Sequence, residues 1–243
     1  MWAGAINVLV GSGTLVTFPT LLLFGYPPLT ANVSNNIGMV AGGISGVYGY
    51  RRELRPNRDM LVRLAPASIA GGLVGAVLLL VLPDESFKAI VPVLIALGLL
   101  MVVIGPAVQR RTAAGRGEGP RGLLSGVLLT VGIFVLGIYG GYFGAAQGIL
   151  LIGLMGMILS DGIQRLTAIK NVLATLVNAV AAIVFVIVAQ DRIDWSVAGL
   201  IASGAFIGGY LGARFGRGLS PRVLRACIVV IGLVALVKIL LFD

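Results

Sequence analysis

Residues 172–190 read VLATLVNAVAAIVFVIVAQ, a run of 19 residues without a single charge. An α-helix needs roughly 20 apolar residues to cross the hydrocarbon core of a bilayer. Residues 91–108 and 122–138 form runs of the same kind, and strands of alternating polarity are missing from the sequence. These runs therefore predict membrane-spanning helices rather than a membrane barrel, because a helix satisfies every backbone group within its own segment.

The composition is that of a polytopic membrane protein. Of the 243 residues, 58% are hydrophobic and 11% are charged, and the mean hydropathy is +1.05, which lies outside the range of soluble domains. Apolar runs and helix breakers predict an all-α transmembrane bundle of about seven to nine helices. The expected helices are 12–24, 30–50, 59–81, 87–108, 122–139, 142–159, 163–189, 195–213 and 222–241.

Several classes of protein are excluded by the residues that are missing. The chain has no histidine, and Cys227 is its single cysteine. These counts argue against a disulfide framework, a thiol relay and the usual metal sites, so we expect no enzyme and no cofactor. The net charge of +9 would suit nucleic acid, but the basic residues lie in short loops between apolar segments. That distribution is typical of cytoplasmic loops, and we expect no nucleic-acid partner.

The second half of the chain repeats the first at a constant offset of 137 residues, as between Gly11 and Gly148. Small and apolar residues recur in register, for example at Gly75 and Gly212. We expect a first repeat at 1–108, a basic linker at 109–121 and a second repeat at 122–243. The counterpart of helix 122–139 would extend beyond Met1, so the opening helix of the first repeat is expected to be short or missing.

Loop charges predict that the two repeats have opposite orientations. The loop 51–63 carries five arginines, whereas its counterpart around Asp191, Arg192 and Asp194 is net acidic. Conversely, the loop at 84–88 is net acidic and its counterpart at 214–225 is basic. By the positive-inside rule, the basic loops 51–63, 109–121 and 214–225 are expected on the cytoplasmic side of the cell membrane. Inverted repeats around a central site are a signature of secondary transporters, which work by alternating access.

Two breaks in the helices are paired by the repeat. The first is the segment 11–14 followed by Pro19, and the second is the glycine-rich segment 140–148. Broken or re-entrant helices near the repeat axis leave amides that attract anions. The alternative is that these glycines only let the helices pack closely.

Polar helix starts follow both breaks. Three asparagines occur within residues 32–36, and Thr167, Lys170 and Asn171 occupy the corresponding region of the second half. Asparagines are costly in lipid unless they face protein or water, so they indicate either a binding site or bonds between helices. Lys170 has three possible roles, which are an ion pair with Asp161, snorkelling beside Arg165 to the cytoplasmic surface, or selection of an anionic substrate. The candidate binding residues are Gly11, Ser12, Gly13, Thr14, Pro19, Asn32, Asn35, Gln147, Gly148, Thr167, Lys170 and Asn171.

At these residues the sequence resembles the sulfite exporter TauE/SafE family. The resemblance rests on the glycine-rich turn 11–13, then Pro19, Leu22, Gly25, Ala31 and the pair Ser34-Asn35. The sequence departs from the family pattern at Thr14, where the third glycine of the turn is expected, and at Ser34, where a threonine is expected. The resemblance implies transport of small sulfur-containing anions such as sulfite or organosulfonates.

The leading hypothesis is a permease for a small anion in the lipid bilayer of the cytoplasmic membrane, and a homo-oligomer is one option for its assembly. The alternative is a membrane scaffold or accessory subunit without transport of its own. A scaffold would be supported by a long soluble extension, and the predicted loops are all short.

Overall fold

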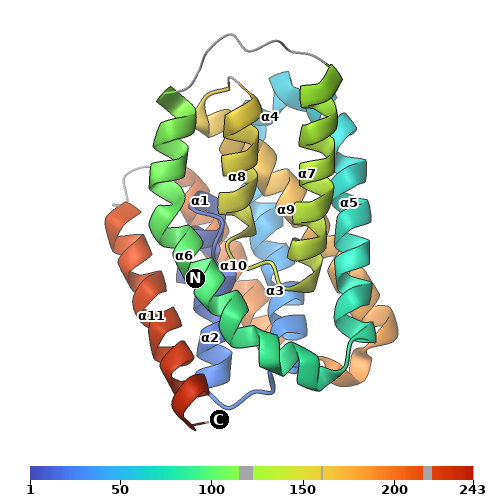
Figure 1. Cartoon of the computed structure of the whole chain (residues 1–243), viewed down its shortest axis with the longest axis vertical. Coiled ribbons are helices and arrows are strands. Elements are labelled where there is room, and N and C mark those ends of the chain that lie inside the picture. The colour runs from blue at the N-terminus through green and yellow to red at the C-terminus, as the bar shows by residue number, and fades with distance from the viewer. Residues whose placement is uncertain (115–122, 160, 216–220, 243) are drawn as a thin grey trace.

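The computed structural model describes residues 1–114, 123–159, 161–215 and 221–242, and these residues form a helical bundle (Figure 1). Most of the predicted linker 109–121 and the middle of the loop 214–225 lie outside the described residues. The elements are α1 (Trp2–Leu9), α2 (Thr14–Leu23), α3 (Pro28–Gly49), α4 (Arg51–Leu54), η1 (Arg55–Asn57), α5 (Arg58–Val81), α6 (Asp84–Ala114), α7 (Leu123–Tyr142), α8 (Gln147–Ile158), α9 (Ile163–Val188), η2 (Gln190–Arg192), α10 (Trp195–Phe215) and α11 (Pro221–Phe242).

Six helical segments among the described residues are long and apolar enough to cross a membrane. They are Arg51–Val81, Asp84–Ala107, Leu124–Tyr142, Ile163–Val188, Trp195–Phe215 and Val223–Leu241. Helix α3 has 22 residues, long enough to cross, but it is more polar than these six. Helices α2 and α8 are apolar and short, with 10 and 12 residues. The predicted all-α membrane fold is confirmed, and each of the nine predicted helices appears, as α2, α3, α5, α6, α7, α8, α9, α10 and α11.

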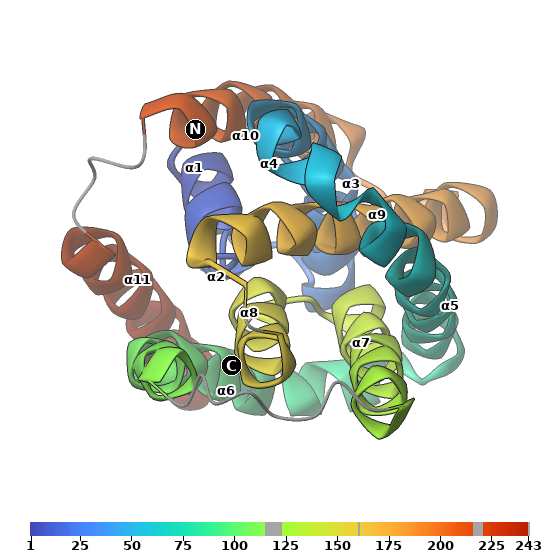
Figure 2. The same ribbon diagram turned by 90° about the horizontal axis from the view of Figure 1, so that it is seen from above.

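Helices of the first half pack on helices of the second half in three matching pairs of contacts. Helix α3 packs on α10 as α9 packs on α5, and α1 packs on α10 as α7 packs on α5. In the third pair, α2 packs on α11 as α8 packs on α6. Helices α5 and α10 begin at Arg58 and Trp195, and α6 and α11 begin at Asp84 and Pro221, which keeps the offset of 137 found in the sequence. Seen from above, α9 runs through the middle of the bundle (Figure 2).

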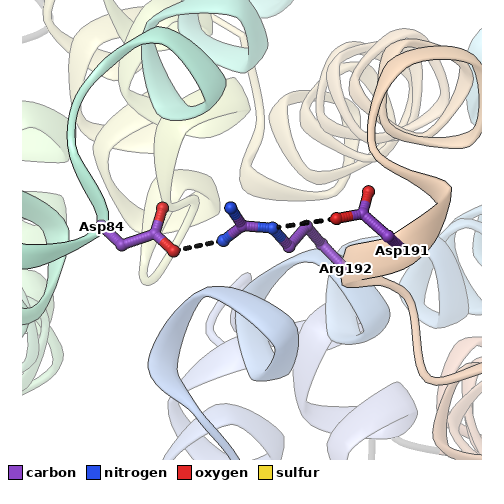
Figure 3. A network of polar contacts seen from close by, with 3 residues as sticks. All are labelled: Asp84, Asp191 and Arg192. Atoms are coloured by element: carbon purple, nitrogen blue, oxygen red, sulfur yellow. Dashed lines mark hydrogen bonds and ion pairs between the residues drawn. The ribbon is translucent and has the colours of Figure 1, made fainter.

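The charged loops lie at two opposite ends of the bundle. Helix α4, with exposed Arg51 and Arg52, is at the top in Figure 1, and α6 begins with Asp84 at the bottom. At the bottom, Arg192 of η2 is hydrogen-bonded to Asp84 and also forms an ion pair with Asp191, with Nε 3.3 Å from Oδ2 (Figure 3). The hydrogen bond to Asp84 raises the pKa of Arg192 above its usual value. We call the end with α4 the basic end and the end with Asp84 the acidic end.

Glycines bring helix backbones into direct contact. A Cβ added to Gly75 of α5 would overlap the carbonyl oxygen of Ile138 in α7, and one on Gly141 of α7 would overlap the carbonyl oxygen of Gly72 in α5. Close approach of this kind is the usual use of small residues in membrane bundles, where packing rather than the hydrophobic effect holds helices together.

We predict that Gly75→Leu destabilises the protein by about 3 kcal/mol or more, because α5 and α7 must separate to admit the side chain. Thermal unfolding in detergent and the monodisperse fraction on size exclusion measure the effect. Gly126→Leu is the matched control, because Gly126 is exposed on α7 with no atom within 4 Å of an added Cβ. Equal stability of the two variants would contradict the packing argument.

Candidate functional site

The two predicted helix breaks meet in the interior of the bundle. The first break separates α1 from α2, and the second separates α7 from α8. The amide of Gly148 donates a hydrogen bond of 3.1 Å to the carbonyl oxygen of Gly11. A Cβ on Gly11 would lie 2.5 Å from the Cα of Gly148, and Gly11 has a φ of +84°. Glycine is required at Gly11 both by this left-handed conformation and by the contact. We call this backbone contact the crossing.

Two helices begin at the crossing. The break before α8 turns through Gly144, with a φ of 75°, and Ala146, with a φ of 58°, and α8 then starts at Gln147. The first turn of a helix has amides without an intrahelical acceptor, and the helix dipole places partial positive charge there. The crossing therefore has the N-terminal ends of both α2 and α8 beside it.

Lys170 of α9 lies against the crossing and is only 1% exposed. Its Nζ donates hydrogen bonds of 3.0 Å to the carbonyl oxygens of both Asn7 and Val8, in the last turn of α1. Its Cδ would lie 2.7 Å from a Cβ added to Gly148. A cation at a helix C-terminus is favourable because it bonds the last carbonyls and offsets the negative end of the dipole.

Two expectations for Lys170 are wrong. Because the side chain is buried, it does not snorkel to the surface. Asp161 does not pair with it either, since Asp161 forms an exposed ion pair of 3.4 Å with Arg165 one turn along. The acceptors are backbone carbonyls of a helix more than 160 residues away in the sequence, and no local pattern points to them.

The asparagines of α3 fix the helices that border the crossing. Asn35 donates to the hydroxyl of Thr14 at 3.4 Å, and its Oδ1 accepts a hydrogen bond from Thr17. Asn32 donates at 2.9 Å to the carbonyl oxygen of Tyr142, at the end of α7. Both amides are buried, and their bonds hold the start of α2 and the end of α7 against α3.

Other predicted residues are also bonded to protein. Gln147 donates at 3.0 Å to the carbonyl oxygen of Leu136 in α7. Thr167 donates at 2.8 Å to the carbonyl oxygen of Ile163, one turn back in its own helix. Pro19 lies inside α2, beyond its first turn, and supplies no donor. The predicted residues that the structure brings to the crossing or its immediate neighbours are Gly11, Ser12, Gly13, Thr14, Gln147, Gly148, Lys170 and Asn171.

The hydroxyl of Ser12, the residue that follows Gly11 at the crossing, is buried and has no hydrogen-bond partner among the described residues; Ser12 is 1% exposed. The Nδ2 of Asn171, the residue after Lys170 on α9, is also buried without such a partner. A buried polar group without a partner costs about 1–3 kcal/mol, so such groups point to a ligand or a functional role. Asn36 Oδ1 and the Tyr142 hydroxyl are also buried without a hydrogen-bond partner among the described residues.

Two polar residues outside the list of candidate binding residues also hold this region together. Ser34 accepts a hydrogen bond of 2.9 Å from the amide of Asp194 in the loop before α10. Lys238 of α11 donates at 3.2 and 3.0 Å to the carbonyl oxygens of Leu22 and Leu23, at the end of α2. Lys238 was detectable, because it is a lone cation in an apolar run like Lys170.

A cleft of about 410 Å³ lies between α6, α7 and α8 and is lined by apolar residues. Two of its lining residues, Val135 and Met157, are more than half exposed, so the cleft opens on the outer surface of the bundle. Its lining contains none of the polar residues around the crossing. Within the described residues no group of three or more histidine, cysteine, aspartate or glutamate side chains could hold a metal ion.

Comparisons with known proteins agree along the whole chain. Residues 1–239 match the family described as "Sulfite exporter TauE/SafE". The chain is 25% identical over 238 residues to "Probable membrane transporter protein ORF9" of Sinorhizobium sp, covering 98% of this chain and 88% of the relative. It is 27% identical over 248 residues to "Probable membrane transporter protein YfcA" of Escherichia coli K12, covering 100% of this chain and 87% of the relative. No solved structure matches the chain.

The crossing predicts a difference between two glycines with almost the same backbone conformation. Gly11 and Gly25 have φ values of +84° and +86°, but a Cβ on Gly25 would have no atom within 4 Å. Alanine at either position costs about 1 kcal/mol for the left-handed conformation, and Gly11→Ala additionally forces apart the two helix breaks. We expect Gly11→Ala to lower the unfolding temperature clearly more than Gly25→Ala. Equal losses would show that the crossing contributes nothing to stability.

Proposed function

Because this chain belongs to the TauE/SafE sulfite exporter family, we propose that it is a secondary transporter for a small anion in the cytoplasmic membrane. The substrate is sulfite, an organosulfonate or a related sulfur oxyanion. The observation that carries the proposal is the crossing, where two half-helices begin beside a buried lysine and the unpartnered hydroxyl of Ser12. Its relatives from Sinorhizobium and E. coli are described as probable membrane transporters.

The chemistry around the crossing suits an oxyanion. The hydroxyl of Ser12 is a free donor, and the first turns of α2 and α8 supply further amides. The ammonium group of Lys170 has three hydrogens, of which two are used on Asn7 and Val8. The third is available to a bound anion, so Lys170 can hold α1 and the substrate at once.

Alternating access between inverted repeats accounts for the arrangement of the helices. Helices of each half pack on matching helices of the other half, and α6 and α11 run in opposite directions along the bundle (Figure 1). Both features are expected of two repeats related by a two-fold axis in the membrane plane. The residues at the crossing are buried, so the proposed transport requires one end of the bundle to open.

The acidic end has a seal that joins the two halves. Asp84 belongs to the first half, and its partner Arg192 belongs to the second (Figure 3). The same loop is held to α3 by the bond from the Asp194 amide to Ser34, which is next to Asn35. Opening the acidic end breaks both contacts. The arginine-rich end with α4 faces the cytoplasm in this proposal, so the seal lies on the outer side.

A scaffold without transport is the second candidate. It requires the glycines and asparagines to serve only packing, and the bonds of Asn32, Asn35 and Gln147 fit that role. It gives no reason for a buried hydroxyl and a buried amide group without partners beside a lysine. These two groups favour the transporter.

We predict that the purified protein moves labelled sulfite across proteoliposome membranes, above the rate of protein-free liposomes. Lys170→Gln at matched incorporation should lower the flux about tenfold or more, because a charge-assisted hydrogen bond to the anion is lost. If the wild-type protein moved no sulfite, sulfonate or related anion under any imposed gradient, the proposed function would be wrong.

The seal is tested by exposing a buried position. Ser34 is 0% exposed, so a thiol placed there by Ser34→Cys, with Cys227→Ala as background, should react slowly with a membrane-impermeant reagent. Asp84→Arg should speed the reaction because it turns the ion pair with Arg192 into a repulsion. The double change Asp84→Arg with Arg192→Asp should restore protection in part, since Asp191 remains beside the new carboxylate. If the thiol at position 34 reacted at the same rate in all these variants, the ion pair would be excluded as a seal.

A further inference from the structure

The four helix ends at the crossing offset one another. Helices α2 and α8 begin there, and α1 and α7 end at the same two breaks. Each helix end carries a partial charge of about half an elementary charge, positive at the N-terminus and negative at the C-terminus. Two positive and two negative ends together contribute about zero net charge.

The formal charge near the crossing comes from one residue. Lys170 is the one charged side chain among the buried polar residues that the structure describes. Its ammonium lies on the carbonyl oxygens of Asn7 and Val8 at the end of α1. The site as a whole therefore has a charge of about +1 when Lys170 is protonated, with the helix ends offset.

The structure assigns a valence to the substrate: we infer that the site selects a monoanion, such as hydrogensulfite or a sulfonate, and discriminates against dianions such as sulfate. This inference rests on the proposed function and narrows it. A monoanion beside Lys170 gives a complex without net charge. A dianion leaves one negative charge buried without a partner, which is the costly arrangement in a low-dielectric interior.

The unpartnered hydroxyl of Ser12 points to the same ligand independently of the helix ends. Ser12 Oγ is buried next to Gly11 without a partner among the described residues. It can donate a hydrogen bond to an oxyanion, and it adds no charge. It therefore binds an oxygen of the anion, whereas Lys170 sets how much charge the site accepts.

The chain has a matched control for Lys170. Lys238 also holds two carbonyl oxygens at the end of a short helix, those of Leu22 and Leu23. It lies at the far end of α2, whose 10 residues place it about 15 Å from the first turn of that helix. Lys238→Gln removes the same kind of helix cap without removing charge from the crossing.

The experiment measures binding to purified protein by the ligand-induced rise in unfolding temperature, using methanesulfonate as the monoanion and sulfate as the dianion. Wild-type protein and Lys238→Gln should prefer methanesulfonate by about tenfold or more, as one uncompensated charge at such separations demands. Lys170→Gln should weaken methanesulfonate binding about tenfold or more, because the buried monoanion then has no countercharge. Ser12→Ala should weaken methanesulfonate binding about tenfold and keep the preference, because it removes one hydrogen bond to a charged group and no charge.

Equal binding of sulfate and methanesulfonate by the wild-type protein would overturn the inference, and so would methanesulfonate binding that Lys170→Gln leaves unchanged. Sulfite flux in proteoliposomes, measured on the same preparations, separates this from the proposed function. Flux without valence selectivity leaves the transporter and rejects the monoanion site. Selective binding without flux of any anion supports the site and rejects the transporter.

Discussion

The hydrogen bond from the Gly148 amide to the Gly11 carbonyl is the contact on which the rest of the structure depends. Breaking a helix inside a membrane exposes backbone groups that lipid does not satisfy, at a cost of several kcal/mol for each group. In this protein two breaks lie against each other and share that hydrogen bond. Lys170 donates a hydrogen bond to a carbonyl oxygen at the end of α1, and Asn32 donates one to a carbonyl oxygen at the end of α7. The hydroxyl of Tyr139 donates a hydrogen bond of 2.6 Å to the carbonyl oxygen of Ala145, which lies in the second break. The breaks are stable because they occur together.

The backbone contact at the crossing requires close packing of the helices that surround it. Two short helices reach the crossing only if their neighbours stand close enough to enclose them, and glycine provides that spacing between α5 and α7. On the other side, a Cβ on Gly42 of α3 would lie 2.8 Å from the Cβ of Ala205 in α10. The contacts of α5 with α7 and of α3 with α10 are the most extensive helix pairs in the bundle. Glycines of this kind belong to the frame of the site, whereas those at 11 and 148 form the crossing itself.

The sequence predicted the parts of this structure that are local in character. Charge-free runs identified the membrane helices, and the glycine segments at 11–14 and 140–148 located both breaks. The roles of individual polar side chains were not predictable, because their partners come from distant segments. For Asn32 and Asn35, the cost of burying an amide indicated either a binding site or bonds between helices, and their donors meet Tyr142 and Thr14. The partners of Lys170 were missed for the same reason, since backbone carbonyls leave no trace in the sequence. The site assignment itself remains a prediction, now concentrated on Ser12, Lys170 and Asn171.

The distribution of strong and weak contacts is itself an argument for movement. Contacts around the crossing are buried and charge-assisted, whereas the contact that joins the halves at the acidic end involves side chains that remain 41% and 51% exposed. Water competes for such a pair and salt screens it, so it holds the two halves together only weakly. A substrate shifts an equilibrium between two conformations by no more than its difference in affinity for them. For the proposed transport of a small anion, weak closure at the acidic end would keep that difference within reach of the substrate, and a rigid crossing would keep the site intact while that end opens.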